Sequence, residues 1–138
     1  MNYRSVADLS DTVRRNLHKI PADVDLLVGI PRSGMLAANL IALNTNLKFC
    51  DIGSYLSDLP LGHGRTRLPR GTNIQKPSAA KHVLFVDDSV CSGGSINQVR
   101  GKVLGFHEHQ NKTFAAVYAA PGSDNFIDIF TQVVTNRA

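Results

Sequence analysis

The sequence predicts an α/β fold: a doubly wound, mainly parallel sheet with helices on both faces. Short apolar runs bounded by turn residues alternate with helix-like segments along the chain. Strands and helices that alternate in this way are joined by right-handed crossovers, which make the strands parallel and place helices over both faces. The length of 138 residues, 43% hydrophobic and 19% charged, suits one globular domain. We expect a single domain over residues 1–138, and whether it is a fragment of a longer chain stays open.

The N-terminal segment is predicted to form a helix that begins at Ser5 and ends before Pro21. Ser5 can cap the first turn, and the residue before a proline avoids the helical region. Apolar residues recur on one face at helical spacing, at Val6, Leu9, Val13 and Leu17. The next run, DLLVGI at residues 25–30, is short, apolar and bounded by turn residues, and it predicts a buried strand.

The middle of the chain contains one predicted helix, one predicted strand and a long stretch without a period. Residues 35–44 (MLAANLIALN) are rich in Ala and Leu and predict a helix, and residues 48–52 predict a further strand. Glycines and prolines interrupt residues 55–80 throughout. A stretch of that length without a period is functional or disordered in most compact domains.

The C-terminal half has the most strand-like segment, HVLFV at residues 82–86. A turn is predicted after it, followed by a helix over residues 94–106 and strands over residues 113–119 and 126–134. Ligands of such sheets bind beyond the carboxyl ends of the strands. Two loops leave strand ends here, and they are our candidate binding loops: residues 29–34 and 87–94.

The string VLFVDDSVCSGGS, residues 83–95, predicts a phosphate-binding loop between a buried strand and a helix. Glycines allow the backbone to turn sharply and to approach a ligand closely. The first amides of a helix lack partners inside the helix and lie at the positive end of its dipole. We therefore expect residues 87–95 to hold an oxyanion.

Asp87 and Asp88 come before the small-residue loop in this string, and their carboxylates would repel a phosphate. They can instead accept hydrogen bonds from vicinal hydroxyls at the other end of a ligand. A molecule with a phosphate at one end and hydroxyls one sugar width away is a ribose 5-phosphate. The chain lacks a Gly-Lys-Ser/Thr ending and a GxGxxG after a strand, which excludes the nucleoside-triphosphatase loop and the dinucleotide fingerprint.

The whole string resembles the phosphoribosyl pyrophosphate (PRPP) signature of type I phosphoribosyltransferases. The resemblance implies that Asp87 and Asp88 hold the ribose hydroxyls. It also implies a set of residues that line the 5-phosphate: Cys91, Ser92, Gly93, Gly94 and Ser95. In 6-oxopurine enzymes of the family the position of Cys91 carries a carboxylate, so a hypoxanthine or guanine enzyme is not the expected one.

A second string, VGIPRSG at residues 28–34, resembles the pyrophosphate loop of the same family. The candidates for binding there are Gly29, Arg32, Ser33 and Gly34. Members of the family often keep a cis non-proline peptide in this loop, so one is expected near Arg32. The resemblance implies that the stretch 55–80 corresponds to the flexible catalytic loop of the family, from which Arg65, Arg67 or Arg70 would approach the ligand.

The resemblance implies transfer of the 5-phosphoribosyl group from PRPP to a nitrogen base, with release of pyrophosphate. Asp87, Asp88 and Arg32 would be the catalytic residues. Mg²⁺ would be bound mainly through PRPP, and we expect no metal site built by the protein alone. The alternative is a non-catalytic sensor or regulatory module that binds PRPP or a nucleotide.

Charge and composition limit the classes of partner that the chain is expected to bind. The net charge is +4, and a basic stretch contains Arg65, Arg67, Arg70, Lys76 and Lys81. An anionic small molecule fits this pattern as well as a polynucleotide does, and nucleic acid is not the expected partner. No apolar run approaches the roughly 20 residues of a membrane span. Two cysteines and no signal peptide lead us to expect a cytoplasmic protein. The resemblance implies a role in nucleotide metabolism and a homodimer.

Overall fold

The computed structural model describes residues 6–61, 74–90, 94–119 and 129–133. Five strands form one sheet in the order β2-β1-β3-β4-β5, and every neighbouring pair is parallel. The strands are β1 (Leu26–Gly29), β2 (Lys48–Asp51), β3 (His82–Val90), β4 (Asn111–Ala119) and β5 (Ile129–Val133). All five lie where the sequence predicts strands, and the parallel sheet is confirmed.

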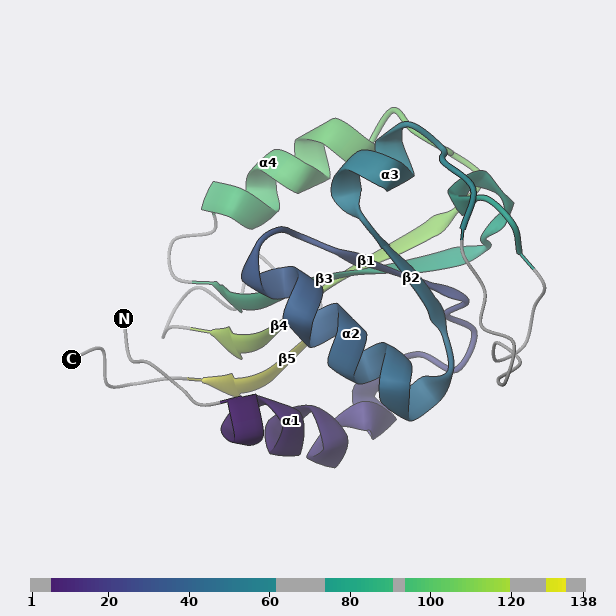
Figure 1. Cartoon of the computed structure of the whole chain (residues 1–138). Helices are drawn as coiled ribbons and strands as arrows, with labels where there is room; N and C mark the ends of the chain where they lie inside the picture. Colours follow the sequence, from purple (N-terminus) through teal and green to yellow (C-terminus); the bar gives the residue numbers. More distant parts are fainter. Residues whose placement is uncertain (1–5, 62–73, 91–93, 120–128, 134–138) are drawn as a thin grey trace.

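Helices cover both faces of this sheet (Figure 1). The helices are α1 (Val6–Arg15), α2 (Ser33–Thr45), α3 (Ile52–Leu56) and α4 (Gly94–Val103), with 3-10 turns η1 (Leu17–Lys19) and η2 (Pro77–Ala79). α1 and α2 lie on one face, and α3 and α4 on the other. The doubly wound arrangement predicted from the sequence is therefore confirmed. None of the helices in the described ranges is both long and apolar enough to cross a membrane.

Alternation along the strands divides the core into two layers. Leu27, Leu84 and Val86 pack beneath α1 and α2, in a cluster that also contains Val13 and Ile41. The intervening residues point to the opposite face. There Val28, Val83 and Phe85 pack with Tyr55 of α3 and with Ile96 and Val99 of α4, among other residues. The two central strands, β1 and β3, are thus covered on both sides, which explains their continuous apolar sequences.

β3 is longer than the sequence predicts. A turn was expected directly after Val86, but the strand continues to Val90. β1 pairs with β3 only as far as Gly29 opposite Val86, whereas β4 pairs with β3 out to Val90. The ladder to β4 holds the polar segment DDSV extended. Asp87 and Asp88 are therefore strand residues, and the prediction that they begin the loop was wrong.

The stretch without a period also contains more structure than expected. α3 begins directly after β2, because the Asp51 side chain accepts a hydrogen bond from the Ser54 amide and caps the helix. Residues 62–73, including Arg65, Arg67 and Arg70, lie outside the described part of the chain. The Leu61 amide donates to the Gln75 carbonyl at 2.7 Å, so the two ends of this stretch are joined.

Candidate functional site

The two predicted binding loops leave the sheet at the point where its strand order reverses. From β1 the chain passes through α2 to β2, which lies on one side of β1. From β3 it passes through α4 to β4, on the opposite side. β1 and β3 are neighbours, so their outgoing segments diverge at the carboxyl edge of the sheet. Open parallel sheets bind their ligands at such a switch point.

Gly34, in the first turn of α2, is packed against the end of β3. A Cβ atom at Gly34 would lie 2.6 Å from the Val86 carbonyl oxygen and 3.2 Å from the Asp87 Cα. Real Cβ atoms do not approach backbone so closely, so only glycine allows this junction. The Ile30 amide adds a hydrogen bond of 2.9 Å to the same Val86 carbonyl. The candidate loop after β1 is thus fixed to β3 immediately before Asp87.

Asp87 lies at this junction with its side chain turned into the protein. It is 8% exposed, and its Oδ1 atom lies 3.5 Å from the Cβ position built on Gly34. The carboxylate therefore stands beside the first turn of α2, where the helix dipole is positive. The backbone contact brings one predicted ribose-binding residue and one predicted pyrophosphate-binding residue together, although they are far apart in sequence.

Arg32 is exposed and immediately precedes α2. The Pro31–Arg32 peptide is cis, as the resemblance of VGIPRSG leads us to expect. Arg32 occupies the N-cap position and its side chain makes no capping hydrogen bond. The first turn of α2 therefore combines a guanidinium with helix amides that the N-cap side chain leaves uncapped, which is an arrangement suited to an anion.

Gly29 has a packing role. A Cβ atom there would lie 2.6 Å from the Met35 sulfur and 3.1 Å from the Gly34 carbonyl oxygen. The last residue of β1 thus makes room for the first turn of α2 above it. Its contact with a ligand, which the resemblance implies, stays a prediction.

The phosphate end of the site is only partly described. Gly94 and Ser95 begin α4, where the sequence predicts a helix start. Cys91, Ser92 and Gly93 lie outside the described residues, and so their role at the 5-phosphate stays a prediction. The side chains of Ser33, Asp88 and Ser95 also lie outside the described part of the structure.

Asp51 is a third carboxylate at the same edge, which the sequence analysis did not single out. It ends β2 opposite Gly29, the last residue of β1. Its carboxylate accepts a hydrogen bond of 2.5 Å from the Ser54 hydroxyl, and this bond lowers the pKa of Asp51. An Asp followed three positions later by Ser at a strand end is a sequence signal for helix capping. Asp51 is thus a structural neighbour of the site.

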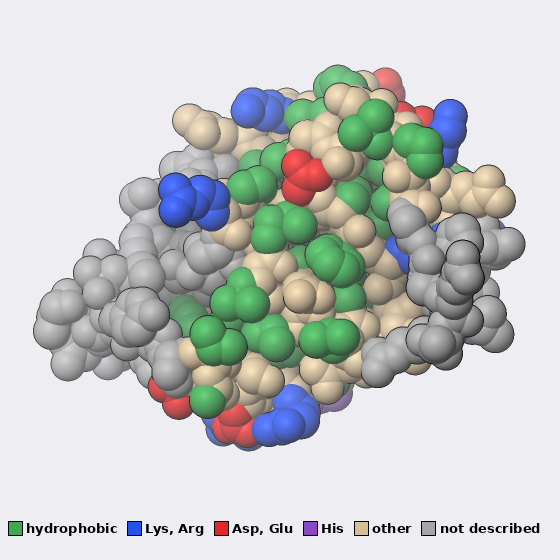
Figure 2. Space-filling model, in the orientation of Figure 1, with side chains coloured by type: hydrophobic (Ala, Val, Ile, Leu, Met, Phe, Trp, Pro, Cys, Tyr) green, Lys and Arg blue, Asp and Glu red, His purple; other side chains and the backbone are tan. Residues whose placement is uncertain are grey.

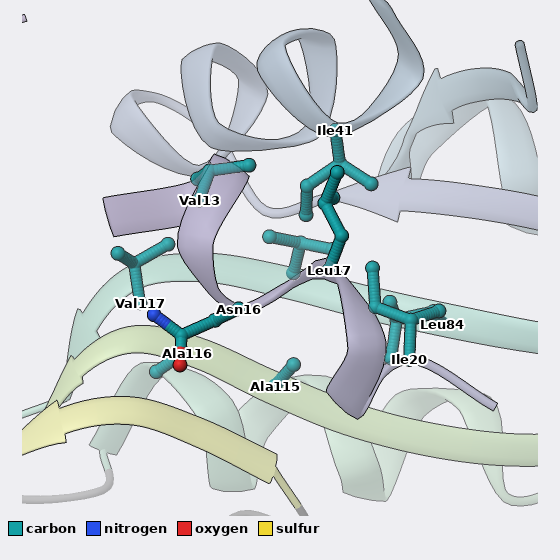
Figure 3. A pocket seen from close by; sticks show the side chains of 10 residues that line it. Val13, Asn16, Leu17, Ile20, Ile41, Leu84, Ala115, Ala116 and Val117 are labelled. Atoms are coloured by element: carbon teal, nitrogen blue, oxygen red, sulfur yellow. The ribbon is translucent and has the colours of Figure 1, made fainter. Parts of the chain in front are cut away.

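A small cavity lies between the sheet and the segments α1, η1 and α2 (Figure 3). Its volume is about 30 Å³, and apolar side chains such as Val13, Leu17, Ile41 and Leu84 surround it. None of the residues that line it is charged, so the cavity offers no ionic partner to a phosphate group.

The amino edge of the sheet is held by a separate polar cluster. The Asp25 carboxylate accepts hydrogen bonds from the amides of Lys81 and His82. The His82 ring contacts Asp23 Oδ1 at 2.9 Å and Thr113 Oγ1 at 2.6 Å. These residues tie the starts of β1, β3 and β4 together, at the edge opposite the candidate site.

No family model and no curated protein matches the chain in sequence. In structure it is similar to the xanthine-guanine-hypoxanthine phosphoribosyltransferase of Helicobacter pylori, with a TM-score of 0.64 and 17% identity over 99% of this chain and 86% of that one. The orotate phosphoribosyltransferase of Aeropyrum pernix gives a TM-score of 0.59 and 11% identity over 92% of this chain and 70% of that one. The adenine phosphoribosyltransferase of Leishmania tarentolae gives a TM-score of 0.56 and 9% identity over 93% of this chain and 69% of that one.

These three enzymes are named for different bases, and what they share with this chain is the fold. The chain has the fold of the type I phosphoribosyltransferases, as the resemblance of its two motifs predicts.

Proposed function

We propose that this protein transfers the 5-phosphoribosyl group from PRPP to a nitrogen base and releases pyrophosphate. The observation that carries the proposal is the close contact between Gly34 and the end of β3. A Cβ atom added to Gly34 would lie only 2.6 Å from the Val86 carbonyl oxygen. The contact joins the segment suited to pyrophosphate to the aspartates suited to ribose, at the edge of the sheet where ligands bind.

In this proposal each part of PRPP has its own contacts. Asp87 and Asp88 accept hydrogen bonds from the ribose hydroxyls. Arg32 and the first amides of α2 bind the pyrophosphate. Residues 91–95 surround the 5-phosphate. The ribose C1 would then lie between the two loops, within reach of a base that enters between them.

The reaction breaks the bond from C1 to the pyrophosphate oxygen and forms a bond from C1 to the base nitrogen, which loses its proton. Negative charge develops on the leaving pyrophosphate, and the ribose gains oxocarbenium character. Arg32 and the positive end of α2 stabilise the first charge, and the aspartates stand near the second.

The residues present fit the expected Mg²⁺. This ion prefers oxygen ligands and keeps several waters when it binds phosphates. The Asp87 carboxylate, beside the first turn of α2, offers oxygen next to the proposed pyrophosphate position. Asp87 and Asp88 would hold the ion through ribose oxygens or water, and the bound ion would neutralise charge on the leaving group.

Phosphorus NMR of PRPP with Mg²⁺ and a panel of purine and pyrimidine bases tests the proposal. Pyrophosphate and a nucleotide 5′-phosphate should appear together with at least one base. Tight binding of PRPP without a product from any base would favour the alternative, a PRPP or nucleotide sensor. If PRPP neither bound nor reacted, both proposed functions would be contradicted.

A further inference from the structure

We infer that Asp23, His82 and Thr113 form a second reactive site, in which the Thr113 hydroxyl accepts the acyl group of a short-chain carboxylic ester. The site lies at the amino edge of the sheet, opposite the proposed PRPP site. The inference therefore holds whether or not the proposed phosphoribosyl transfer is correct.

The three side chains form an unbroken line of contacts between three separate segments of the chain. Asp23 lies before β1, His82 begins β3, and Thr113 is the third residue of β4. Asp23 Oδ1 lies 2.9 Å from His82 Nδ1, and Thr113 Oγ1 lies 2.6 Å from His82 Nε2. A hydroxyl within hydrogen-bond reach of a histidine that a third group orients is the arrangement of an activated nucleophile.

The Asp23 carboxylate fixes the direction of these hydrogen bonds. Its hydrogen bond to His82 lowers the pKa of Asp23, so this group is ionised at neutral pH and can only accept. In the neutral imidazole the proton therefore lies on Nδ1, and Nε2 is left as an acceptor. The Thr113 hydroxyl then donates to Nε2, and His82 can take this proton as Thr113 attacks.

The histidine ring is enclosed, whereas the threonine is partly open. The His82 side chain is 10% exposed, and the Asp25 carboxylate accepts a hydrogen bond from the His82 amide, which fixes the start of β3. Thr113 is only half-buried. The base is thus held in one position, next to a nucleophile that solvent and substrate can approach.

The apolar cavity described above begins one step further along the same two strands. Leu84 and Ala115 line it, and they follow His82 and Thr113 by two residues. Residues two apart on a strand point to the same face and lie about 7 Å from each other. Because the cavity is small and apolar, at about 30 Å³, it suits the methyl end of a short acyl chain.

The helix above the cavity supplies no base for the reaction. No ionisable residue occurs between Ser33 and Thr45 of α2. Figure 2 shows hydrophobic side chains gathered over α2, with most of the Lys, Arg, Asp and Glu side chains towards the edges of this face. The base for chemistry beside the cavity therefore comes from the sheet, at the start of β3.

The reaction is an acyl transfer followed by hydrolysis. The Thr113 oxygen forms a bond to the ester carbonyl carbon, and its proton passes to His82 Nε2. The bond from that carbon to the leaving alcohol breaks, and the alcohol takes the proton from His82. Water then attacks the acyl-threonine in the same way, which releases the carboxylic acid and restores the Thr113 hydroxyl.

The release of p-nitrophenol from p-nitrophenyl acetate and from p-nitrophenyl hexanoate, measured with the full chain, tests the inference. The acetate should react faster, because the hexanoyl chain is too long for the cavity. Diisopropyl fluorophosphate, which forms a stable ester with an activated hydroxyl, should label Thr113, and peptide mass spectrometry locates the label. A chain left unlabelled at Thr113, or a hexanoate that reacts as fast as the acetate, would overturn the inference.

Thr113→Val removes the hydroxyl at nearly the same size, and His82→Gln removes the base. Each should lower the rate with the acetate by roughly tenfold or more, since a positioned base contributes about a hundredfold or more and surface lysines add a slow background. Thr113→Ser keeps a hydroxyl and should remain active. Asp23 positions the ring, so Asp23→Asn should slow the reaction and Asp23→Glu should restore much of the rate.

Thr45→Val is the matched control, and it should react like the wild type. Thr45 is also half-buried, but its hydroxyl donates to the Ile41 carbonyl at 2.8 Å and contacts no histidine. Far-UV circular dichroism confirms that each variant is folded. A folded Thr113→Val variant that reacts as fast as the wild type would overturn the inference, and so would an equal loss in Thr45→Val.

Discussion

Asp87 is a buried carboxylate whose backbone and side chain both lie against the first turn of α2. We predict that Asp87→Asn weakens PRPP binding roughly ten- to hundredfold, because hydrogen bonds to a charged group contribute about 1.5–3 kcal/mol. Titration calorimetry measures the change. Asp51→Asn is the control, since Asp51 ends β2 at the same edge of the sheet and its carboxylate caps α3. Equal losses in both variants would argue against a ribose contact at Asp87.

Arg32 is the exposed cation next to α2, and it should recognise pyrophosphate more than sugar. We predict that Arg32→Ala lowers the affinity for pyrophosphate by roughly tenfold or more, as expected for loss of a charge-assisted hydrogen bond. The affinity for ribose 5-phosphate should fall much less. The two dissociation constants, measured side by side, check this.

The control for Arg32 is Arg14→Ala, which removes the same charge from α1, where Arg14 pairs with Asp11 at 3.1 Å. Its effect on both ligands should be small. If Arg32→Ala reduced both affinities to the same extent, Arg32 would have a structural role.

The first turn of α2 is the element that depends most on a single residue. Gly34→Ala should destabilise the protein by about 1–3 kcal/mol, the usual effect of overpacking, because its Cβ would meet the Val86 carbonyl at 2.6 Å. Gly101→Ala in α4 is the matched control, since a Cβ there meets nothing within 4 Å. It should stabilise the helix by roughly 0.5–1 kcal/mol. Urea unfolding compares the two variants, and a Gly34→Ala variant as stable as the wild type would contradict the tight junction.

The elements that the sequence predicts well are those whose own residues determine them. DLLVGI and HVLFV are continuously apolar because β1 and β3 are buried on both faces. The extension of β3 through DDSV was missed because it depends on pairing with β4, which is distant in sequence. α3 was missed because it has only 5 residues, too few to show a period.

The sequence predicts individual residues of the candidate site, but not the contact between them. The motif strings identified Asp87 and Gly34 separately, and alternation of strands and helices placed both at the carboxyl edge of the sheet. The contact between them follows only from the pairing of β1 with β3, which no local pattern encodes. The capping role of Asp51 is predictable from its spacing of three residues to Ser54, although the sequence analysis does not include it.

At the scale of the whole molecule, the candidate binding site and a structural polar cluster lie at opposite edges of the sheet. This cluster includes the contact between Asp23 and His82, whose hydrogen bond lowers the pKa of Asp23. A carboxyl group with a lowered pKa in the folded state stabilises the fold above its unfolded pKa, and this contribution disappears as the pH falls through the folded value. In Asp23→Asn this part of the acid sensitivity should be absent.

Urea unfolding between neutral pH and pH values below the ordinary Asp pKa of about 3.9 measures this difference. The stabilities of the wild type and Asp23→Asn should converge as the pH falls through the lowered pKa. Parallel curves with a constant difference would show that the hydrogen bond between Asp23 and His82 contributes nothing that depends on protonation.

The extra length of β3 has a consequence for its peptide groups. In a strand, the amide and the carbonyl of one residue face the same neighbouring strand, and those of the next residue face the other; the Val86 carbonyl faces β1, since it accepts from the Ile30 amide. The Asp88 amide and carbonyl therefore face the side that β1 leaves at Gly29. A bound ligand would shield this amide from solvent deuterium, while the Asp87 amide, which faces β4, would exchange slowly with or without ligand.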